Sequence, residues 1–457
     1  MCGGQVTRYL ILGNGAAGAT AAEEIRLTDV RGEITVVSAE PYPMYSRPGL
    51  AYVLMNEVPD RQVIARQPDW YEARRIRLVF ATATQLDVAA RRVWLNNGAT
   101  LPFDRLLLAT GARAAPLPYA GANLDGVVFL DTLDGTKDLL KRMKKARRAV
   151  VVGGGITALE MAEGFAHHKI ETHYCVRKET LWSAVFNAEE SQLLAERMQA
   201  HGVHIHYNTE IAEVLGDAKG CVSGVRLNSG ETLECDLLGA GIGVKPQLDV
   251  VRGTPIRVDK AILVNEFLET NVPGIYAAGD CAQIFDRWTQ KHLLDVLWPT
   301  AVAAGRVAGR NMAGQREAYV KGTPFNACLL FGLHITAIGQ LGQLRDASEP
   351  EVFQHTSRGS SEVWFSRPTA YSSAWAQSGA DTVRLALNGN QLVGALIIGN
   401  QQLADPLRAL IDQQTDVSAL RPYLQTGGPQ LAEHVLKFWK LTKMQAMQTP
   451  VLVTSKV

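Results

Sequence analysis

The chain has 457 residues, of which 47% are hydrophobic and 20% charged, and its formal net charge is +1. A single hydrophobic core stops growing at roughly 250–300 residues, so two or three domains are expected. The composition excludes global disorder. The near-neutral charge gives no chain-wide field that would favour nucleic acid or an anionic membrane as the default partner. Specificity must therefore come from local sites.

The six cysteines lie far apart in the sequence and form no C-x-x-C pair. Close neighbours among them therefore cannot build a zinc site or hold an iron–sulfur cluster, and reduced thiols and no metal are expected. The first residues lack the charged-then-apolar run of a signal peptide, and no apolar stretch approaches the ~18 residues that span a bilayer. These features predict a soluble cytoplasmic protein.

The first motif is a strand, a glycine turn and a helix. A short, mostly apolar strand at residues 8–12 runs into a G-x-G-x-x-G turn at residues 13–18, which opens an alanine-rich helix. Gly13 permits the tight turn, Gly15 lets the backbone approach a pyrophosphate, and Gly18 lets helix and strand pack closely. The helix N-terminus offers N–H groups to the phosphates, so this motif predicts a dinucleotide site.

A second strand, at residues 33–40, ends in Glu40. A carboxylate at this position can accept hydrogen bonds from both hydroxyls of an adenosine ribose. The alternative is a solvated strand end without a ligand. The order of strand, glycine turn, helix, strand and acid favours the ribose contact.

Three further segments follow in order: residues 40–50, 106–113 and 270–282. Together with the first turn, they resemble the pyridine nucleotide-disulfide oxidoreductase superfamily over roughly residues 6–425. The branch that they resemble most holds rubredoxin reductases, oxygenase-coupled ferredoxin reductases and the flavin part of assimilatory nitrite reductases. The resemblance implies bound FAD, with Asp280 as the partner of the flavin's ribityl chain. The residues that it places along FAD also include Gly13, Gly15, Ala16, Ala17, Gly18, Glu40, Arg47, Ala83, Thr110 and Gly111.

An alanine-rich helix is expected at residues 298–310. Its positive N-terminus is placed to stabilise negative charge on the reduced isoalloxazine. Trp298, the first residue of this helix, is either a flavin contact or a core residue.

A second strand–turn–helix motif begins at residues 148–152. Its turn carries Gly153, Gly155 and Ala158, in the G-x-G-x-x-A form that NADP-type sites often use. Two such motifs indicate two dinucleotides. By resemblance, Glu160 faces the nicotinamide and flavin N5, and otherwise it is a solvated side chain on the helix.

The strand at residues 171–176 ends in Arg177 and Lys178 rather than in an acid. A guanidinium pairs with a 2′-phosphate through charge-assisted hydrogen bonds, whereas a carboxylate repels it. The strand also resembles the NADPH-binding strand of glutathione reductases. NADPH is favoured, and Glu179 leaves NADH open. Gly243, in the segment that returns the chain to the flavin domain, is expected near the nicotinamide.

Redox cysteines are missing from the expected flavin site. Disulfide reductases of the superfamily place a C-x-x-x-x-C pair after the ribose acid, but no cysteine stands between Glu40 and Leu54. Thiol relay chemistry is therefore unavailable at that position. Tyr52 stands where carrier-reducing relatives have a lysine, which puts a Lys–Glu pair with Glu160 in doubt. His334 is expected to be a packed or surface residue rather than an acid or base.

The pattern changes to strands and turns from about residue 322. Strands are expected at residues 335–339, 362–365, 382–387 and 391–399, followed by a helix at residues 403–414. Asn388 and Gly389 predict a type I′ hairpin turn. This region resembles the interface domain that dimerises many superfamily members, with a structural cap as the alternative.

Residues 430–447 predict an amphipathic helix. Its apolar positions include Leu431, Val435, Phe438 and Trp439, with basic residues between them. The helix could dock on its own core, on a partner protein or on a membrane surface. Docking onto protein is favoured.

The expected fold is α/β: two Rossmann-like dinucleotide-binding domains, one inserted in the other, and a C-terminal α+β interface domain. The expected segments are 1–115 and 245–321 for FAD, 116–244 for NAD(P)H, 322–425 for the interface domain and 426–457 for a helical tail.

The expected function is hydride transfer from NADPH or NADH to FAD, followed by electron transfer to an external acceptor. An iron–sulfur or rubredoxin-type carrier is favoured as that acceptor, in a homodimer or a heteromeric complex. One alternative is a quinone reductase at a membrane surface. Another is a flavoprotein subunit with a mainly structural or interaction role.

Overall fold

The computed structural model describes residues 6–286, 290–341, 382–426 and 430–448. The chain divides into two compact units, and the described residues up to Lys321 belong to the first and those from Gly322 to the second. The strand expected at residues 362–365 lies outside the described residues.

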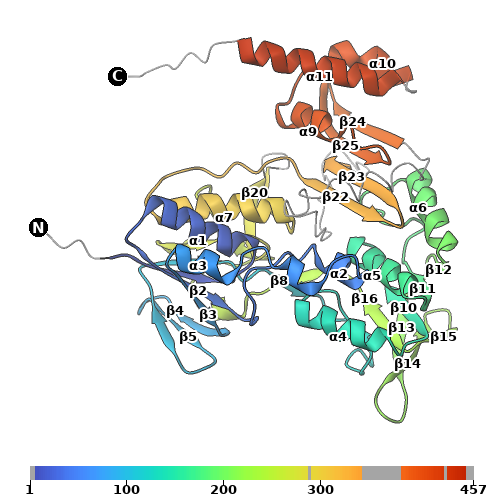
Figure 1. Ribbon diagram of the computed structural model, residues 1–457, viewed down its shortest axis with the longest axis horizontal. Helices are drawn as coiled ribbons and strands as arrows, with labels where there is room; N and C mark the ends of the chain where they lie inside the picture. Colours follow the sequence, from blue (N-terminus) through green and yellow to red (C-terminus); the bar gives the residue numbers. More distant parts are fainter. Residues whose placement is uncertain (1–5, 287–289, 342–381, 427–429, 449–457) are drawn as a thin grey trace, which may run out of the picture. The chain divides into compact units, whose positions relative to one another are not determined.

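The first unit contains two parallel sheets of five strands (Figure 1). The first sheet has the order β19-β7-β1-β2-β3. Its members are β1 (Arg8–Leu12), β2 (Glu33–Ser38), β3 (Ile76–Phe80), β7 (Arg105–Leu108) and β19 (Ile275–Ala277). Leu10, Ile11 and Leu12 of the central strand are at most 2% exposed. A parallel strand covered on both faces reads as a continuous apolar run, which is the pattern of this segment.

The second sheet repeats this arrangement in the order β12-β11-β10-β16-β9. Its members are β9 (Val127–Val128), β10 (Arg148–Val152), β11 (Glu171–Cys175), β12 (Val203–His206) and β16 (Leu237–Ala240). Two parallel sheets, each with a glycine turn and a helix after a central strand, confirm the predicted Rossmann-like α/β fold.

Helices α1 (Ala16–Thr28) and α7 (Trp298–Met312) lie side by side (Figure 1). Glycines on α7 permit this close contact, because a Cβ atom at Gly305 would lie 2.3 Å from the carbonyl oxygen of Ala17. The other helices of the first unit are α2 (Leu50–Leu54), α3 (Pro68–Ala73), α4 (Leu133–Met143), α5 (Ile156–His167), α6 (Ala188–Ala200), η1 (Asp60–Val63) and η2 (Asp249–Val251).

Smaller sheets complete the first unit. They are formed by β4 (Ala83–Asp87), β5 (Arg92–Leu95) and β6 (Thr100–Pro102); by β13 (Ile211–Gly216), β14 (Val222–Leu227) and β15 (Thr232–Glu234); and by β18 (Ile262–Leu263), β20 (Ala282–Asp286) and β21 (Lys291–Leu294). The strands β8 (Ala112–Ala114) and β17 (Val244–Pro246) pair with each other in antiparallel fashion. They lie where the chain leaves the first sheet for the second and where it returns.

The second unit contains an antiparallel sheet of four strands in the order β22-β23-β25-β24. Its elements are β22 (Phe325–Leu330), β23 (Leu333–Gly339), β24 (Thr382–Asn388), β25 (Gln391–Ile398), α9 (Ala404–Asp412), η4 (Ser418–Leu420), α10 (Arg421–Thr426) and α11 (Gln430–Gln448). Strands and helices of this kind confirm the α+β class expected for the C-terminal region.

The β24–β25 hairpin is confirmed, but its predicted turn type is wrong. Asn388 pairs with Gln391, so the two loop residues are Gly389 and Asn390. A type I′ turn needs positive φ at both loop positions, and among these two only Gly389 has it, at 59°. Glycine at the first loop position suits a type II′ turn, which needs positive φ there alone.

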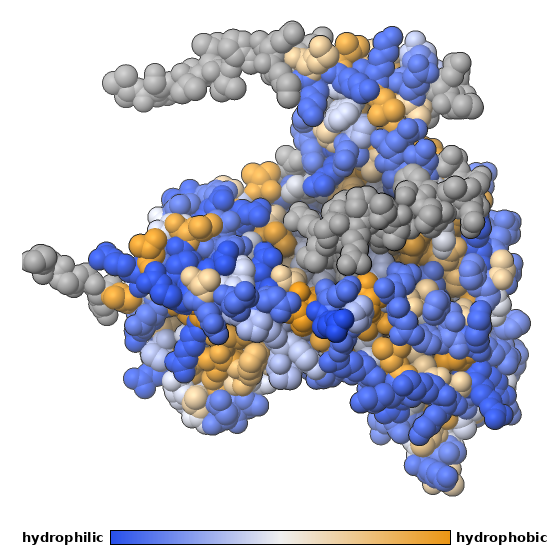
Figure 2. Space-filling view, in the orientation of Figure 1, coloured by the Kyte–Doolittle hydropathy of each residue, from blue (hydrophilic) through white to orange (hydrophobic). Residues whose placement is uncertain are grey.

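Helix α11 packs on the core of its own unit. Val435 is completely buried there, and Leu436, Phe438 and Trp439 are partly buried against the same cluster. Leu441 and Met444 are more than half exposed, and Figure 2 shows hydrophilic and hydrophobic residues interspersed over α10 and α11. The structure thus supports docking of this helix on its own core. Within the described part of the chain, no helix combines the length and the apolar character that a membrane crossing requires.

The packing of α11 can be tested with two truncations on the same helix. We expect Val435→Ala to lower the free energy of unfolding of the second unit by about 1–3 kcal/mol, because it leaves a cavity in the core. Leu441→Ala, at a position that is 51% exposed, should change it by less than about 0.5 kcal/mol. Hydrogen exchange of the β25 amides measures both effects. Equal protection in the two variants would contradict the packing role of Val435.

Candidate functional site

The parallel strands of the first sheet bring distant segments to one edge. The N–H of Gly13, after β1, donates to the carbonyl oxygen of Val37 in β2 at 2.8 Å. The N–H of Ala278, after β19, donates to the carbonyl oxygen of Leu108 in β7 at 3.1 Å. The glycine turn, the end of β7 and the segment that holds Asp280 therefore meet at the carboxyl edge of this sheet.

A cleft opens at this edge, and we call it the first cleft. Its lining includes almost all the residues that the sequence predicted for FAD: Gly13, Gly15, Ala16, Ala17, Glu40, Arg47, Ala83, Thr110, Gly111, Asp280 and Trp298. Gly18 does not line the cleft and packs behind the turn instead. Trp298 lines the cleft and also packs against the core, so its two predicted alternatives are not exclusive.

The three glycines of the first turn have different surroundings. Gly13 has a φ of +115°, and a Cβ atom on it would lie 2.0 Å from the carbonyl oxygen of Ala109. A Cβ atom on Gly18 would lie 1.9 Å from the carbonyl oxygen of Gly13. At Gly15 a Cβ atom would meet nothing within 4 Å. The fold therefore excludes side chains at Gly13 and Gly18, whereas the space at Gly15 is open to a ligand.

Gly15 is also the N-cap residue of α1. Because glycine has no side chain, no side-chain group of this residue caps the first N–H groups of the helix. The first N–H groups of a helix need partners from outside the helix, and phosphate oxygens can supply them. The residues of this turn therefore fit a pyrophosphate.

Glu40 is held by two neighbours. Its carboxylate accepts a hydrogen bond of 2.6 Å from the hydroxyl of Tyr45 and pairs with the guanidinium of Arg47. The Tyr45 oxygen accepts the N–H of Leu133 at 3.2 Å, and burial raises the pKa of Tyr45. A carboxylate has about four acceptor positions, so these two donors leave capacity for a ribose hydroxyl. Tyr45 is a site residue that the motif analysis missed, although it stands only two positions before Arg47.

Arg47 links this cluster to the start of α4. Its Nη1 donates to the carbonyl oxygen of Asp131 at 2.5 Å. The carboxylate of Asp131 in turn accepts the N–H of Ala114 in β8 at 3.0 Å. A positive guanidinium in the wall of the cleft is suited to an anionic group of a dinucleotide.

Thr110 is fixed by a residue that no motif indicated. Its hydroxyl donates to the carbonyl oxygen of Gln247 at 2.6 Å, and the Gln247 amide donates to the carbonyl oxygen of Thr110 at 2.9 Å. Gln247 also lines the first cleft. The two residues are 137 positions apart in the chain, so sequence spacing carried no signal for this pair.

The lining residues of the first cleft include no cysteine. Cys281 follows Asp280, but its thiol is buried and donates to the carbonyl oxygen of Leu108 at 3.3 Å. Burial raises the pKa of Cys281, and it raises the pKa of Cys175 and of Cys235 to about 12. All cysteines in the described ranges are free, as predicted.

The second glycine turn also depends on close backbone contacts. Gly153 has a φ of +148°, and a Cβ atom on it would lie 2.2 Å from the carbonyl oxygen of Gly241. A Cβ atom on Gly241 would lie 2.7 Å from the Cβ of Ala158. The alanine at the third motif position is thus accommodated because its neighbour is a glycine. Gly155 is the N-cap of α5, again without a side-chain cap hydrogen bond.

Arg177 and Lys178 follow β11 and are exposed. The Arg177 side chain is 73% exposed, and its Nε lies 3.8 Å from a carboxylate oxygen of Glu210. Glu210 follows β12, and its place beside Arg177 was not apparent from the sequence. Gly243, between β16 and β17, has a φ of +108° and accepts the N–H of Ala115 at 2.9 Å.

Glu160 lies on α5 and is only 8% exposed. The alternative of a solvated helical glutamate is therefore wrong. Its role near a nicotinamide stays a prediction. His334 is half-buried on β23, where burial lowers its pKa, which agrees with a packed residue.

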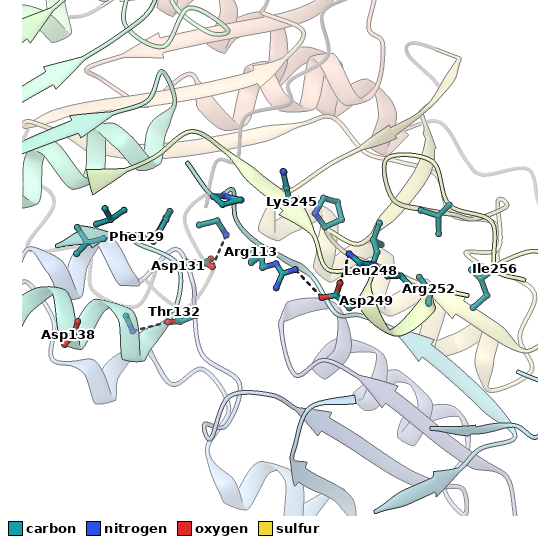
Figure 3. A pocket seen from close by; sticks show the side chains of 18 of the residues that line it. Arg113, Phe129, Asp131, Thr132, Asp138, Lys245, Leu248, Asp249, Arg252 and Ile256 are labelled. Carbon is teal, nitrogen blue, oxygen red and sulfur yellow. Dashed lines mark hydrogen bonds and ion pairs between the residues drawn. The ribbon is translucent and has the colours of Figure 1, made fainter. Parts of the chain in front are cut away.

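A second cleft, which no motif predicted, lies along β8 and β17 (Figure 3). In Figure 3 the Arg113 side chain extends to Asp249, to which it lies within 3.2 Å. Arg252 pairs with the same carboxylate at 3.0 Å. The two clefts share Asp131 and Asp249 as lining residues. Two guanidinium groups thus share the single carboxylate of Asp249, and the lining of this cleft contains no motif for a particular ligand.

Residues 7–305 match the family model described as pyridine nucleotide-disulphide oxidoreductase. A nitrite reductase [NAD(P)H] of Bacillus subtilis is 27% identical over 92% of this chain and 50% of its own length. Rhodocoxin reductase of Rhodococcus erythropolis is 33% identical over 60% of this chain and 64% of its own length. The match thus spans half to two thirds of these relatives.

Among solved structures, a ferredoxin reductase from Rhodopseudomonas palustris resembles this chain with a TM-score of 0.77 and 23% identity. The similarity covers 90% of this chain and 98% of that one, and it supports the fold.

The two kinds of glycine in the first turn predict separable defects. We expect Gly18→Ala to destabilise the apoprotein by about 1–3 kcal/mol, because the new methyl group overlaps the Gly13 carbonyl. Gly15→Ala should leave the apoprotein stable and weaken FAD binding about tenfold or more, which is roughly 1.4 kcal/mol, because the methyl group enters the open space. Thermal unfolding of apoprotein and titration with FAD give the two values. Unchanged FAD affinity in Gly15→Ala would contradict the predicted FAD contact at this turn.

Proposed function

Because the chain belongs to the pyridine nucleotide-disulphide oxidoreductase family, for which FAD and a pyridine nucleotide are the implied cofactors, we propose that it is an FAD-dependent NAD(P)H oxidoreductase. In this proposal the electrons leave for an external acceptor, an iron–sulfur or rubredoxin-type carrier protein. Bound FAD would supply the chemistry, which is to accept a hydride from the nicotinamide and to release single electrons.

The observation that carries the proposal is the composition of the first cleft. Segments from the two ends of the first unit's sequence meet there, from the glycine turn of Gly13 to Asp280 and Trp298. The wall combines an uncapped helix N-terminus, a carboxylate at Glu40 and a guanidinium at Arg47. We assign the helix N-terminus to the pyrophosphate and Glu40 to the ribose of FAD, as the motif predicted, and Arg47 to a position along FAD, as the family resemblance implied.

The protein's own residues would act by orientation. Gln247 holds Thr110, and Tyr45 holds Glu40, so the contact groups are fixed before the cofactor binds. Hydride transfer between stacked rings needs little acid or base help, and correct placement of the rings supplies much of the rate. We keep Glu160 and Gly243 as predicted neighbours of the nicotinamide.

The chemistry of the cleft favours an external acceptor over a thiol relay. The lining has no cysteine, and Cys281, which follows the lining residue Asp280 in the sequence, has its thiol buried and its pKa raised by that burial. Thiol exchange requires an accessible thiolate, so this route is disfavoured. One relative, rhodocoxin reductase, is named as the reductase of rhodocoxin, which supports an acceptor outside the enzyme for this chain as well.

The two alternatives differ in what they require. Quinone reduction at a membrane surface would use helix α11 as the anchor, but Val435, Phe438 and Trp439 of that helix pack on its own unit. A mainly structural flavoprotein role would not require reduction by a nicotinamide nucleotide. A cytoplasmic location, a homodimer or heteromeric complex, and the domain boundaries given above stay predictions.

We also propose that NADPH is preferred over NADH. The support is the pair of cations after β11, Arg177 and Lys178, which could bind a 2′-phosphate. Glu210 lies 3.8 Å from Arg177 and partly offsets its charge, which makes the preference moderate.

The central test is anaerobic reduction. We expect NADPH or NADH to bleach the visible absorbance of the FAD-loaded protein within its turnover time. The reason is that the nicotinamide ring would stack on the flavin ring and transfer a hydride to it. Air or a carrier should then restore the absorbance. If neither nucleotide bleaches the flavin, the oxidoreductase proposal is wrong and a structural role is favoured.

The same reduced protein can identify the class of acceptor. A ferredoxin and a rubredoxin should restore the absorbance rapidly, whereas a soluble quinone analogue should act slowly. Fast oxidation by the quinone alone would favour the membrane-surface alternative.

Nucleotide preference can be tested at Arg177. We expect Arg177→Ala to lower kcat/KM for NADPH about tenfold to hundredfold, since a charge-assisted hydrogen bond contributes about 1.5–3 kcal/mol. The value for NADH should change little. Arg31→Ala, which removes another exposed arginine, is the matched control. Equal losses for both nucleotides would contradict a 2′-phosphate contact.

A further inference from the structure

A buried group of three charged residues lies outside the motifs. The ammonium of Lys321 is 3.3 Å from a carboxylate oxygen of Asp286 and 3.2 Å from one of Asp295. The three residues are 5%, 3% and 9% exposed, respectively. We call these residues the lysine cluster, and they all belong to the first unit.

The arrangement of the lysine cluster favours the charged form of Lys321 although the residue is buried. Burial disfavours the ammonium, but the two carboxylates outweigh this effect and raise the pKa of Lys321. Transfer of such charges out of water is expensive, and a buried ion pair is often no more stabilising than apolar residues of the same volume. A gain in overall stability is therefore a poor explanation for the cluster. Fixing one particular arrangement is a better one.

The cluster ties together two segments that flank the first cleft. Asp286 ends β20, the strand that follows Asp280 and Cys281. Asp295 stands just before α7, and its other carboxylate oxygen accepts the N–H of Leu297, the N-cap residue of that helix, at 3.2 Å. Lys321 thus holds the entry of α7 against the end of β20.

The segment after Asp295 reaches the cleft directly. Val296, Trp298 and Ala301 all line the first cleft. A Cβ atom at Gly279, the residue before Asp280, would lie 3.8 Å from the Cβ of Ala301. The first turn of α7 therefore lies beside the segment that holds Asp280, and the lysine cluster holds the start of that turn through Asp295.

A small displacement of this turn would change the electrostatics of the cleft. The N-terminus of a helix carries roughly half a positive charge, and its effect falls off within the first turn. Groups that act on a reacting centre must be held to within roughly 0.5 Å to keep their effect.

We propose that Lys321 is a positioning residue that holds the N-terminus of α7 against bound FAD and thereby sets the affinity and the midpoint potential of the flavin. This inference rests on the proposed assignment of FAD to the first cleft. Lys321 acts through Asp295 and Leu297, and it need not touch the cofactor itself.

The test compares Lys321→Met with Lys260→Met in the full chain. Methionine has a similar length and no charge, and Lys260 is an exposed lysine of the same unit. We expect Lys321→Met to bind FAD about tenfold more weakly and to lower the midpoint potential of bound FAD, measured by equilibration with a reference dye. Reduction adds negative charge to the flavin. This charge is less favoured once the Lys321 ammonium is lost and the positive N-terminus of α7 is displaced. Lys260→Met should keep both values.

A double variant covers the case that Lys321→Met does not fold. Lys321→Met with Asp286→Asn removes one positive and one negative charge, so the net charge of the cluster is unchanged. We expect it to fold and to bind FAD more weakly than the wild type, because Asp295 is no longer tied to β20.

Wild-type FAD affinity and midpoint potential in whichever of these variants folds would overturn the inference. If the unfolding temperature of the apoprotein falls while both flavin values stay unchanged, the cluster is a structural tie only. Neither flavin measurement uses a nicotinamide nucleotide or a carrier. A failure of the proposed electron transfer can thus be distinguished from a failure of this inference.

Discussion

The close approach of helix α1 to strand β1 is the constraint on which the first cleft depends. The backbone at Gly18 lies so near the carbonyl of Gly13 that a Cβ atom would be only 1.9 Å from its oxygen. A Cβ atom at Gly13 would in turn overlap the carbonyl of Ala109 at the end of β7. Because the backbones of three segments meet here and neither Gly13 nor Gly18 carries a side chain, the N-terminus of α1 can point into a cleft at the edge of the sheet. The same arrangement recurs at Gly153, Gly241 and Ala158 in the second sheet.

Around this constraint, the site is held by contacts between residues that do not form part of one motif. Tyr45 and Arg47 hold Glu40 from the same loop, whereas Gln247 reaches Thr110 from a distant part of the chain. On the far side of the cleft, Lys321 holds the entry of α7 through Asp295. Preorganised contact groups cost less to order when a ligand binds, which suits a tightly held cofactor.

The cleft also explains why a member of a disulphide oxidoreductase family would work without a redox disulphide. Cys281 lies in the sequence beside Asp280, yet its thiol turns into the core and is bonded to a backbone carbonyl. The position after Glu40 is taken by Tyr45 and Arg47, which bind the acid rather than exchange electrons. In the proposed function, specificity for an acceptor would therefore come from surfaces outside the cleft.

The sequence by itself determined the parallel sheets, the glycine turns and the set of residues around Gly13, Glu40 and Asp280, because backbone geometry demands glycine and apolar runs at regular positions. It could not decide the burial of Glu160, the partner of Thr110 or the turn at Gly389, since these depend on packing and register between segments far apart in the chain. Only the tertiary structure placed Glu210 beside Arg177 and Lys321 between two aspartates. Charge pairs of this kind depend on distance in space, and no periodicity in the sequence records it.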